Sequence, residues 1–197
     1  MPEHRDIVDA QLHQPKGAST ALEGQLMRAK GDGTIEWKYP PEGWGSYKHS
    51  TTQVFDNTFS KLTIDGLSAA SIQTYLPREI RGSGQLWDVV TNKITPITIG
   101  DVYEIRLDLP ITAESGSPVE ITVELDIGGT ASPTNVIVER YAATGRATPY
   151  SLSFAFPVYT GSTFVPNGGQ IFIKTNTGSI TTTGAGITIV RLTAGDW

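Results

Sequence analysis

Hydrophobic and polar residues alternate one by one along several stretches in the second half of the chain. The clearest is 119–127, whose apolar positions are Val119, Ile121, Val123, Leu125 and Ile127. The positions between them are Glu120, Thr122, Glu124 and Asp126. A period of two places successive side chains on opposite faces of a strand. This pattern therefore predicts a β-strand with one face in a core and the other in water.

The same period recurs on both sides of this stretch. In 102–111 the apolar positions are Tyr103, Ile105, Leu107, Leu109 and Ile111, and in 152–158 they are Leu152, Phe154, Phe156 and Val158. Shorter strand candidates are 136–141, 170–174 and 186–192, and segments rich in Gly, Pro, Ser and Asn separate them. Such segments favour turns. From about residue 50 we expect roughly eight to ten strands, which indicates an all-β domain, a jelly-roll β-sandwich.

The first 38 residues have a different character. Residues 6–12 offer one or two helical turns, which are too short to be stable alone in water. Two apolar-alternating runs, 24–30 and 34–38, flank a short loop of Gly31, Asp32 and Gly33. This arrangement predicts a β-hairpin. Because a lone two-stranded hairpin is marginal in water, we expect this arm to dock on its own β-domain, a sister subunit or another protein.

Proline, glycine and aromatic residues are concentrated in 39–49, beginning with Tyr39, Pro40 and Pro41. Paired prolines stiffen a segment and glycines end that stiffness, as in a linker. The chain is therefore expected to have three parts: an arm over 1–38, a linker over 39–49 and a β-domain over 50–197. Within the β-domain, 67–76 is the one stretch that favours a helix or an irregular crossing, and Pro77 would end it.

Charge and composition exclude several classes of function. The formal net charge is −5, and Lys and Arg do not cluster, so no electrostatic footprint for nucleic acid is present. The absence of Cys excludes disulfides, thiol catalysis and thiolate metal sites. It also favours assembly in a reducing cytoplasm. No run approaches the ~18 apolar residues of a membrane span, and the polar N-terminus predicts no signal peptide.

Residue types that carry chemistry are scattered. Glu120, Glu124 and Asp126 share a strand face, where a solvated polar face is a better interpretation than a glycosidase carboxylate pair. The three histidines, His4, His13 and His49, lack the spacing of metal ligands. No serine lies in a nucleophile-elbow motif. We therefore expect no catalytic residues, no metal and no cofactor. Aromatic residues at Trp37, Tyr39, Trp44 and Tyr47 suit packing of the linker, or alternatively stacking on sugar rings.

One motif set resembles a known class of proteins. His13, Pro15, Lys16 and Gly17 are followed by Ala21, Gly24-Gln25, Ala29, the Gly31–Gly33 loop and Trp37. This series is similar to the N-terminal segment of tailed-bacteriophage head-fibre, decoration or cement proteins. The resemblance implies that this segment attaches to the major capsid protein. It further implies that the β-domain is a trimeric jelly roll like tumour necrosis factor. The short linker favours a compact cap on the shell over a projecting fibre.

On this hypothesis the chain is a virion structural protein that binds the outer face of the phage head as a homotrimer and stabilises it. The expected capsid-binding residues are Ile7, Leu12, His13, Pro15, Lys16, Gly17, Leu26, Met27, Ile35 and Trp37. No contact with nucleic acid or membrane is expected. The alternative is a receptor- or glycan-binding module of a phage fibre, with Trp44 and Tyr47 as the sugar platform. A third class, an enzyme such as a capsule depolymerase, is disfavoured by the lack of a catalytic constellation.

Overall fold

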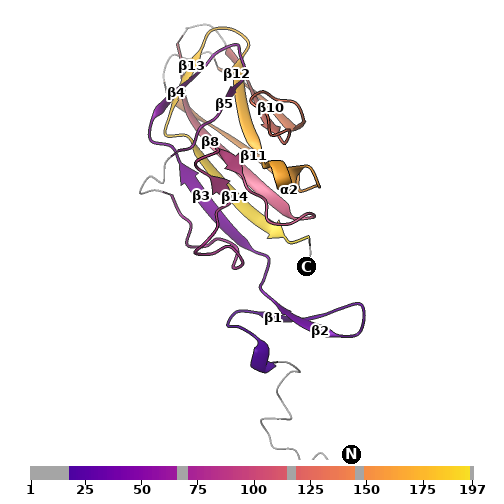
Figure 1. The fold of residues 1–197 in the computed structure, drawn as a ribbon. Coiled ribbons are helices and arrows are strands. Elements are labelled where there is room, and N and C mark those ends of the chain that lie inside the picture. Colours follow the sequence, from indigo (N-terminus) through magenta and orange to yellow (C-terminus); the bar gives the residue numbers. More distant parts are fainter. Residues whose placement is uncertain (1–17, 66–70, 115–118, 145–148, 196–197) are drawn as a thin grey trace, which may run out of the picture. The chain divides into compact units, whose positions relative to one another are not determined.

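The fold is seen in a computed structural model of the 197-residue chain. It describes residues 18–65, 71–114, 119–144 and 149–195. The chain divides into two compact units, Met1–Pro40 and Pro41–Trp197 (Figure 1). The expected helical turns at 6–12 lie outside the described residues.

The first unit contains the predicted hairpin. A short 3₁₀ helix, η2 (Ala18–Thr20), precedes strands β1 (Leu26–Ala29) and β2 (Ile35–Lys38), which pair antiparallel. The loop between them closes as its sequence predicts. Gly33 has a φ of +79°, in the left-handed region that favours glycine. Asp32 Oδ1 accepts hydrogen bonds from the backbone N–H of Thr34 at 2.9 Å and from its hydroxyl at 2.6 Å.

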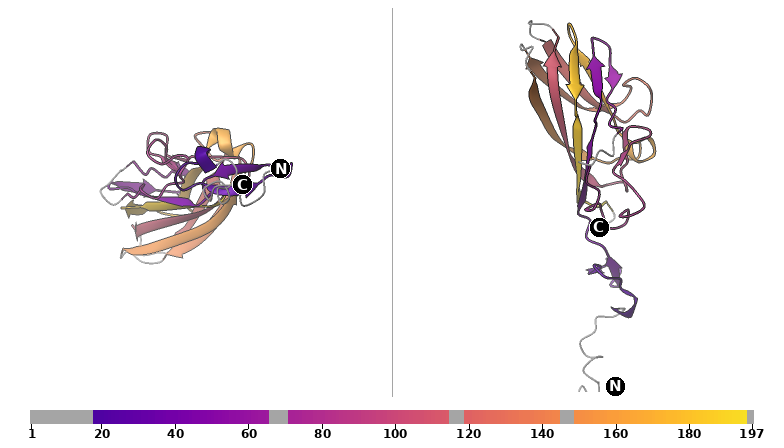
Figure 2. Two further views of the ribbon diagram at one scale, coloured as in Figure 1. Left: turned by 90° about the horizontal axis from the view of Figure 1, so that it is seen from below. Right: turned by 90° about the vertical axis from the view of Figure 1, so that its left-hand side faces the viewer.

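The second unit is a jelly-roll β-sandwich of two antiparallel sheets (Figures 1 and 2). The strands of the first sheet are β3 (Gly43–Lys48), β4 (Thr52–Phe55), β8 (Val102–Ala113), β11 (Tyr150–Tyr159), β13 (Ile180–Thr183) and β14 (Gly186–Thr193). The strands of the second sheet are β5 (Ser60–Lys61), β9 (Val119–Asp126), β10 (Val136–Thr144) and β12 (Gln170–Thr175). The remaining elements are the short hairpin β6 (Trp87–Asp88) and β7 (Lys93–Ile94), and the four-residue helix α2 (Phe164–Asn167).

Two of the strand positions in the first sheet are each filled by two short strands placed end to end. β13 and β14 both pair with the same side of β8, and β4 and β3 pair with β13 and β14 in turn. Gly184, between β13 and β14, has a φ of +79°, which interrupts the strand at that point. β11 lies along the other side of β8. The sheet is thus four strand positions wide, in the order β11, β8, β13 with β14, and β4 with β3.

The hydrophobic core lies between the two sheets and comes from the alternating positions that the sequence indicates. Tyr103, Ile105, Leu107, Leu109 and Ile111 of β8 are buried, as are Val119, Ile121, Val123 and Leu125 of β9 and Phe154, Phe156 and Val158 of β11. The three predicted strands and the all-β fold class are therefore confirmed. Burying such side chains contributes about 1.5–3 kcal/mol each, before the loss of conformational entropy is counted.

Two sequence expectations need correction. Residues 43–48 of the expected linker form β3, so the β-unit begins at Pro41 rather than at 50. Residues 67–76 are expected from the sequence to be a helix or an irregular crossing, and their described part, 71–76, is an irregular crossing. Ile72 exchanges backbone hydrogen bonds with Ser46, and Tyr75 O accepts from Trp44 N at 2.8 Å. These bonds cover the outer edge of β3, which would otherwise expose unpaired backbone groups.

The second correction concerns the polar face of β9. Only Glu120 is exposed there, whereas Glu124 and Asp126 retain 8% and 0% of their accessible surface. Asp126 is buried because its carboxylate organises the loop that follows the strand. Its oxygens accept from Gly128 N at 2.9 Å, Thr134 N at 2.8 Å and Asn135 N at 2.5 Å. The prediction of a fully solvated face is therefore wrong for this strand.

A buried ionic network ties the last strand to the start of β8. The guanidinium of Arg191 is fully buried and lies 2.8 Å from Asp101 Oδ1, and it also pairs with Glu79. Tyr103 donates its hydroxyl hydrogen to Asp101 Oδ2 at 2.7 Å. Burial, together with that hydrogen bond, raises the pKa of Tyr103 far above its usual range, so the phenol stays neutral and acts as a donor.

Candidate functional site

The arm hairpin has one apolar face and one mixed face. In its register Met27 lies opposite Trp37 and Ala29 lies opposite Ile35, so these four side chains share a face. The other face carries Leu26 opposite Lys38 and Arg28 opposite Glu36. An Arg28–Glu36 ion pair of 3.5 Å spans that second face. Of the predicted capsid-binding residues, Met27, Ile35 and Trp37 are thus brought together, and Leu26 points away from them.

The apolar face is only partly covered. Met27 keeps 52% of its surface exposed, and Ile35 and Trp37 are half-buried. Trp37 Nε1 is shielded from solvent and has no hydrogen-bond partner among the described residues. On the mixed face Leu26 is 52% exposed, and Leu22, which precedes β1, is 61% exposed. The hairpin therefore presents hydrophobic side chains on both faces. The remaining predicted residues of the arm, Ile7, Leu12, His13, Pro15, Lys16 and Gly17, lie outside the described residues.

The two aromatic residues of the glycan alternative have different environments. Tyr47 is fully buried, and its hydroxyl oxygen accepts a hydrogen bond from Leu86 N at 2.9 Å. Its ring cannot stack on a sugar, so this part of the alternative is wrong. Trp44 is half-buried and stacks on Tyr75, with ring centroids 5.3 Å apart. That stack seals the covered edge of β3, which matches the packing role expected for the linker aromatics.

A groove that the sequence did not suggest lies on the outer face of the second sheet. It encloses about 360 Å³ and is lined by Asn57, Glu120, Thr122, Glu139, Tyr141, Lys174, Thr175 and Asn176. We call it the β9 groove. Its origin is visible in the strand register, because Thr122 of β9 lies between Tyr141 of β10 and Lys174 of β12. A short central side chain flanked by two long ones leaves a trough along the middle strand.

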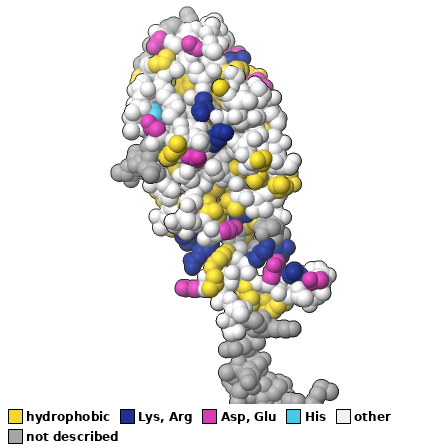
Figure 3. Space-filling model, viewed as in Figure 1, with side chains coloured by type: hydrophobic (Ala, Val, Ile, Leu, Met, Phe, Trp, Pro, Cys, Tyr) yellow, Lys and Arg dark blue, Asp and Glu magenta, His cyan; other side chains and the backbone are white. Residues whose placement is uncertain are grey.

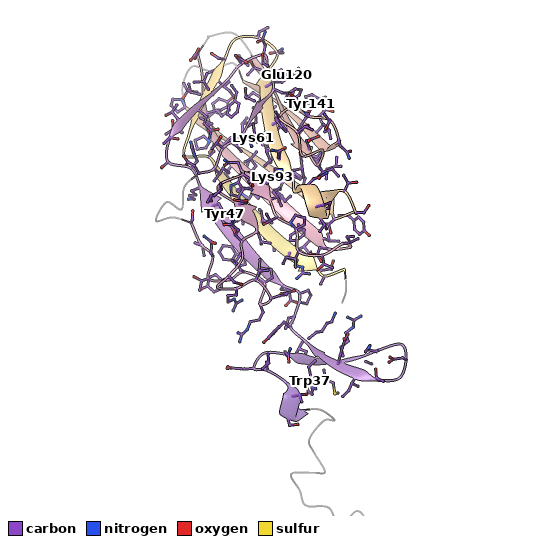
Figure 4. All side chains as sticks on the ribbon, viewed as in Figure 1. Trp37, Tyr47, Lys61, Lys93, Glu120 and Tyr141 are labelled. Atoms are coloured by element: carbon purple, nitrogen blue, oxygen red, sulfur yellow. The ribbon has the colours of Figure 1, made fainter. Side chains whose placement is uncertain are left out.

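The walls of the β9 groove are held in place. Tyr141 donates its hydroxyl hydrogen to Glu139, two residues away on the same face, while its ring is 61% exposed. On the opposite wall, Lys174 Nζ lies 4.2 Å from the centre of the Phe59 ring, within the range of a cation–π contact. Glu120 and Tyr141 lie close together on this sheet (Figure 4). The groove thus combines an exposed aromatic ring with both hydrogen-bond donors and acceptors.

Glu124 lies on the same face, next to the groove. It pairs across the strands with Glu139 and Phe172, and its Oε2 is buried with no hydrogen-bond partner among the described residues. Burial, followed by the nearby charge of Glu139, raises the pKa of Glu124, and Lys174 opposes this shift. Further along this sheet, Lys61 Nζ donates to Thr91 O at 3.0 Å, which holds the β6–β7 segment against it (Figure 4).

The surface features of the second unit are otherwise dispersed. On the face drawn in Figure 3, hydrophobic side chains form several small groups separated by polar atoms. Within the described ranges, no cluster of three or more His, Asp or Glu side chains could hold a metal ion. His49 is buried, with Nδ1 2.6 Å from Asp65 Oδ1 and Nε2 2.5 Å from Thr51 Oγ1. No helix of the described residues is long and apolar enough to cross a membrane.

Comparison with known proteins gives similarities of structure alone. No protein-family model matches the chain, and no curated protein matches it. Among solved structures, it is similar to the Eiger TNF of S. frugiperda, with 10% identity, a TM-score of 0.44 and coverage of 79% of this chain and 95% of that one. It is also similar to the PRD1 vertex protein P5, with 12% identity, a TM-score of 0.46 and coverage of 86% of this chain and 83% of that one. A third similar structure is a carbohydrate-binding module of Cellvibrio mixtus lichenase 5A in complex with cellotriose. Its identity is 13%, its TM-score is 0.30, and the match covers 87% of this chain and 89% of that one.

Proposed function

We propose that this chain is a bacteriophage virion structural protein, a decoration or cement protein that binds the outer surface of the head through its N-terminal arm. The role is structural and involves no enzymatic step. The observation that carries the proposal is the β1–β2 hairpin, which forms within a separate unit and exposes hydrophobic side chains on both faces. It lies at the positions where the sequence resembles the attachment segments of phage head proteins, from Gly24 to Trp37.

The geometry of the hairpin suits docking on another protein. Its two strands of four residues pair only with each other among the described residues, so each has an outer edge available for strand addition. Met27, Ile35 and Trp37 form an apolar face that a capsid subunit would cover. Full burial of one such side chain contributes about 1.5–3 kcal/mol, so a few of them suffice for a specific but weak contact.

A homotrimer would convert weak arm contacts into stable attachment. Ordering an arm on binding costs conformational entropy, so a single arm binds weakly. Three linked arms raise the effective concentration of the second and third contacts. A trimer that binds only the expanded shell also stabilises that state by mass action. We place the subunit contact in the β-unit, where β11 ends in Tyr159, a ring that is 66% exposed.

The test begins with the full-length chain in solution. Light scattering is expected to give a mass near three times the 21.2 kDa of the chain. Co-sedimentation with purified heads that lack this protein should then show saturable binding. A stable monomer would remove the multivalent argument, and failure to bind heads would overturn the proposal.

A matched pair of variants locates the contact. Trp37→Ala should weaken head binding at least about tenfold, because it removes the largest side chain of the apolar hairpin face. Trp44→Ala, which removes a tryptophan stacked within the β-unit, is the control and should leave head binding unchanged. Equal losses in both variants would contradict attachment through the hairpin.

A further inference from the structure

The β9 groove has the dimensions and the side chains of a small-molecule site. Its volume of about 360 Å³ falls at the lower end of the range typical of ligand pockets. It lies on three adjacent strands of the second sheet, and the middle strand, β9, is paired on both sides, which gives the groove a rigid floor. The floor residue Thr122 is 5% exposed, whereas the Tyr141 ring on the wall is 61% exposed. A ligand in the trough would therefore contact the face or edge of this ring.

The polar groups of the groove are of both kinds. Glu120 and Glu139 supply carboxylate acceptors, Lys174 supplies an ammonium donor, and Asn57 supplies an amide that both donates and accepts. Neither Glu120 nor Asn57 has a side-chain hydrogen bond or ion pair among the described residues. Both line the groove, and Glu120 is exposed to solvent. These two groups are free to bond a ligand without breaking contacts that hold the fold together.

The charges narrow the choice of ligand. Two exposed carboxylates against one ammonium disfavour an anionic ligand such as a phosphate or a sialylated sugar. Lys174, in turn, disfavours a cation at the centre of the trough, and no metal-binding cluster is present in the described residues. A neutral ligand with many hydroxyl groups fits best, because each hydroxyl both donates and accepts, and because the apolar side of a sugar ring packs on an exposed aromatic ring.

We propose that the β9 groove is a binding site for a neutral saccharide, with Tyr141 as the stacking residue and Glu120, Asn57 and Lys174 as hydrogen-bonding residues. This site lies in the β-unit and does not rest on capsid attachment through the arm. A decoration protein with such a site would also bring the particle to neutral glycans on a cell surface or in its surroundings.

Saturation-transfer NMR and calorimetry on the full-length protein test the proposal. The probes are maltotriose, cellotriose and tri-N-acetylchitotriose, with sialyllactose as the anionic comparison and trilysine as the cationic one. At least one neutral probe is expected to bind with a Kd below about 1 mM, and sialyllactose more weakly. Tyr141→Ala should raise that Kd about tenfold, and Glu120→Gln about threefold.

Val54→Ala is the control, because it truncates an exposed side chain on β4 of the other sheet, away from the proposed subunit contact. It should leave the Kd unchanged. Thermal unfolding of all three variants should coincide with that of the wild type, since the altered side chains are exposed. The absence of binding by every neutral probe at about 10 mM, well above the range of weak sites, would overturn the proposal. So would equal losses in Tyr141→Ala and Val54→Ala, or preferential binding of trilysine at the same residues.

Discussion

Asp101→Asn removes the fully buried negative charge that faces Arg191. In the wild type Asp101 accepts hydrogen bonds from Arg191 Nη2 at 2.8 Å, the Tyr103 hydroxyl at 2.7 Å, Thr98 N at 3.0 Å and Gly195 N at 2.9 Å. The asparagine keeps the size of the side chain but leaves the buried guanidinium with a single carboxylate partner, which is itself partly exposed. We therefore expect the substitution to destabilise the β-unit severely.

The magnitude follows from the burial of both charged groups. Breaking a buried ion pair by removing one partner costs about 3–5 kcal/mol, because the remaining charge stays desolvated and uncompensated. For a chain of this length, that loss corresponds to a fall in Tm of about 6–20 °C. The Nε–H of Arg191 is also buried and has no hydrogen-bond partner among the described residues. The wild-type network therefore has no additional hydrogen bond to Arg191 that could compensate for the loss of the Asp101 carboxylate.

Asp108→Asn is the matched control. It breaks the Arg106–Asp108 pair on the neighbouring strand positions, at 3.0 Å, in which both side chains are exposed. An exposed pair contributes about 0–1 kcal/mol. The assay is urea denaturation followed by tryptophan fluorescence, with Tm from calorimetry. If Asp101→Asn costs no more than Asp108→Asn, the ionic network does not hold the last strand in place and the reasoning is refuted.

Other substitutions test separate parts of the structure. The raised pKa of Glu124 means that the folded protein binds this proton more tightly than the unfolded chain, so stability is lost as pH rises from the usual glutamate range through the raised value. Glu124→Gln should remove that loss. In denaturation curves, the unfolding free energy of the variant minus that of the wild type should therefore increase with pH. A difference that stays constant with pH would contradict the raised pKa of Glu124. Tyr47→Phe leaves Leu86 N without its acceptor and should cost about 1–3 kcal/mol in the same assay. Gly43→Ala would place a Cβ 2.2 Å from Pro77 N, so β3 must shift, and we expect loss of stability by more than about 1 kcal/mol together with altered near-UV dichroism.

Alternation predicts burial residue by residue only in strands that have one face in the core and the other in water, and β9 is not such a strand. β8 and β11 satisfy that condition along most of their length, so alternation and burial agree residue by residue. The hairpin in the arm is equally local, because a loop of glycine and aspartate sets both the turn and the register of its strands. The opposite directions of Leu26 and Met27 also follow from that register once the strand bounds are known.

Residues 43–48 show where local pattern is insufficient. Glycine alternates there with Trp44 and Ser46, a composition typical of a linker. The segment becomes a strand because β14, far away in the chain, offers it a complete ladder of hydrogen bonds. Close approach also requires glycine at this place, since a Cβ on Gly45 would lie 2.8 Å from the Tyr47 hydroxyl. No feature within the segment itself reports these long-range partners.

The candidate sites divide in the same way. The amino-acid sequence alone determined an all-β fold, a separate hairpin arm and the absence of a cysteine-based chemistry, because strand period, turn residues and composition are local properties. The tertiary structure decided which polar residues lie in water and which together form a groove. Glu120 is exposed and Glu124 is buried, although both occupy the same face of β9. Thr122 forms the floor of the β9 groove only because Tyr141 and Lys174 flank it from two other strands. The pairing of β9 with β10 and β12 places these two side chains beside Thr122.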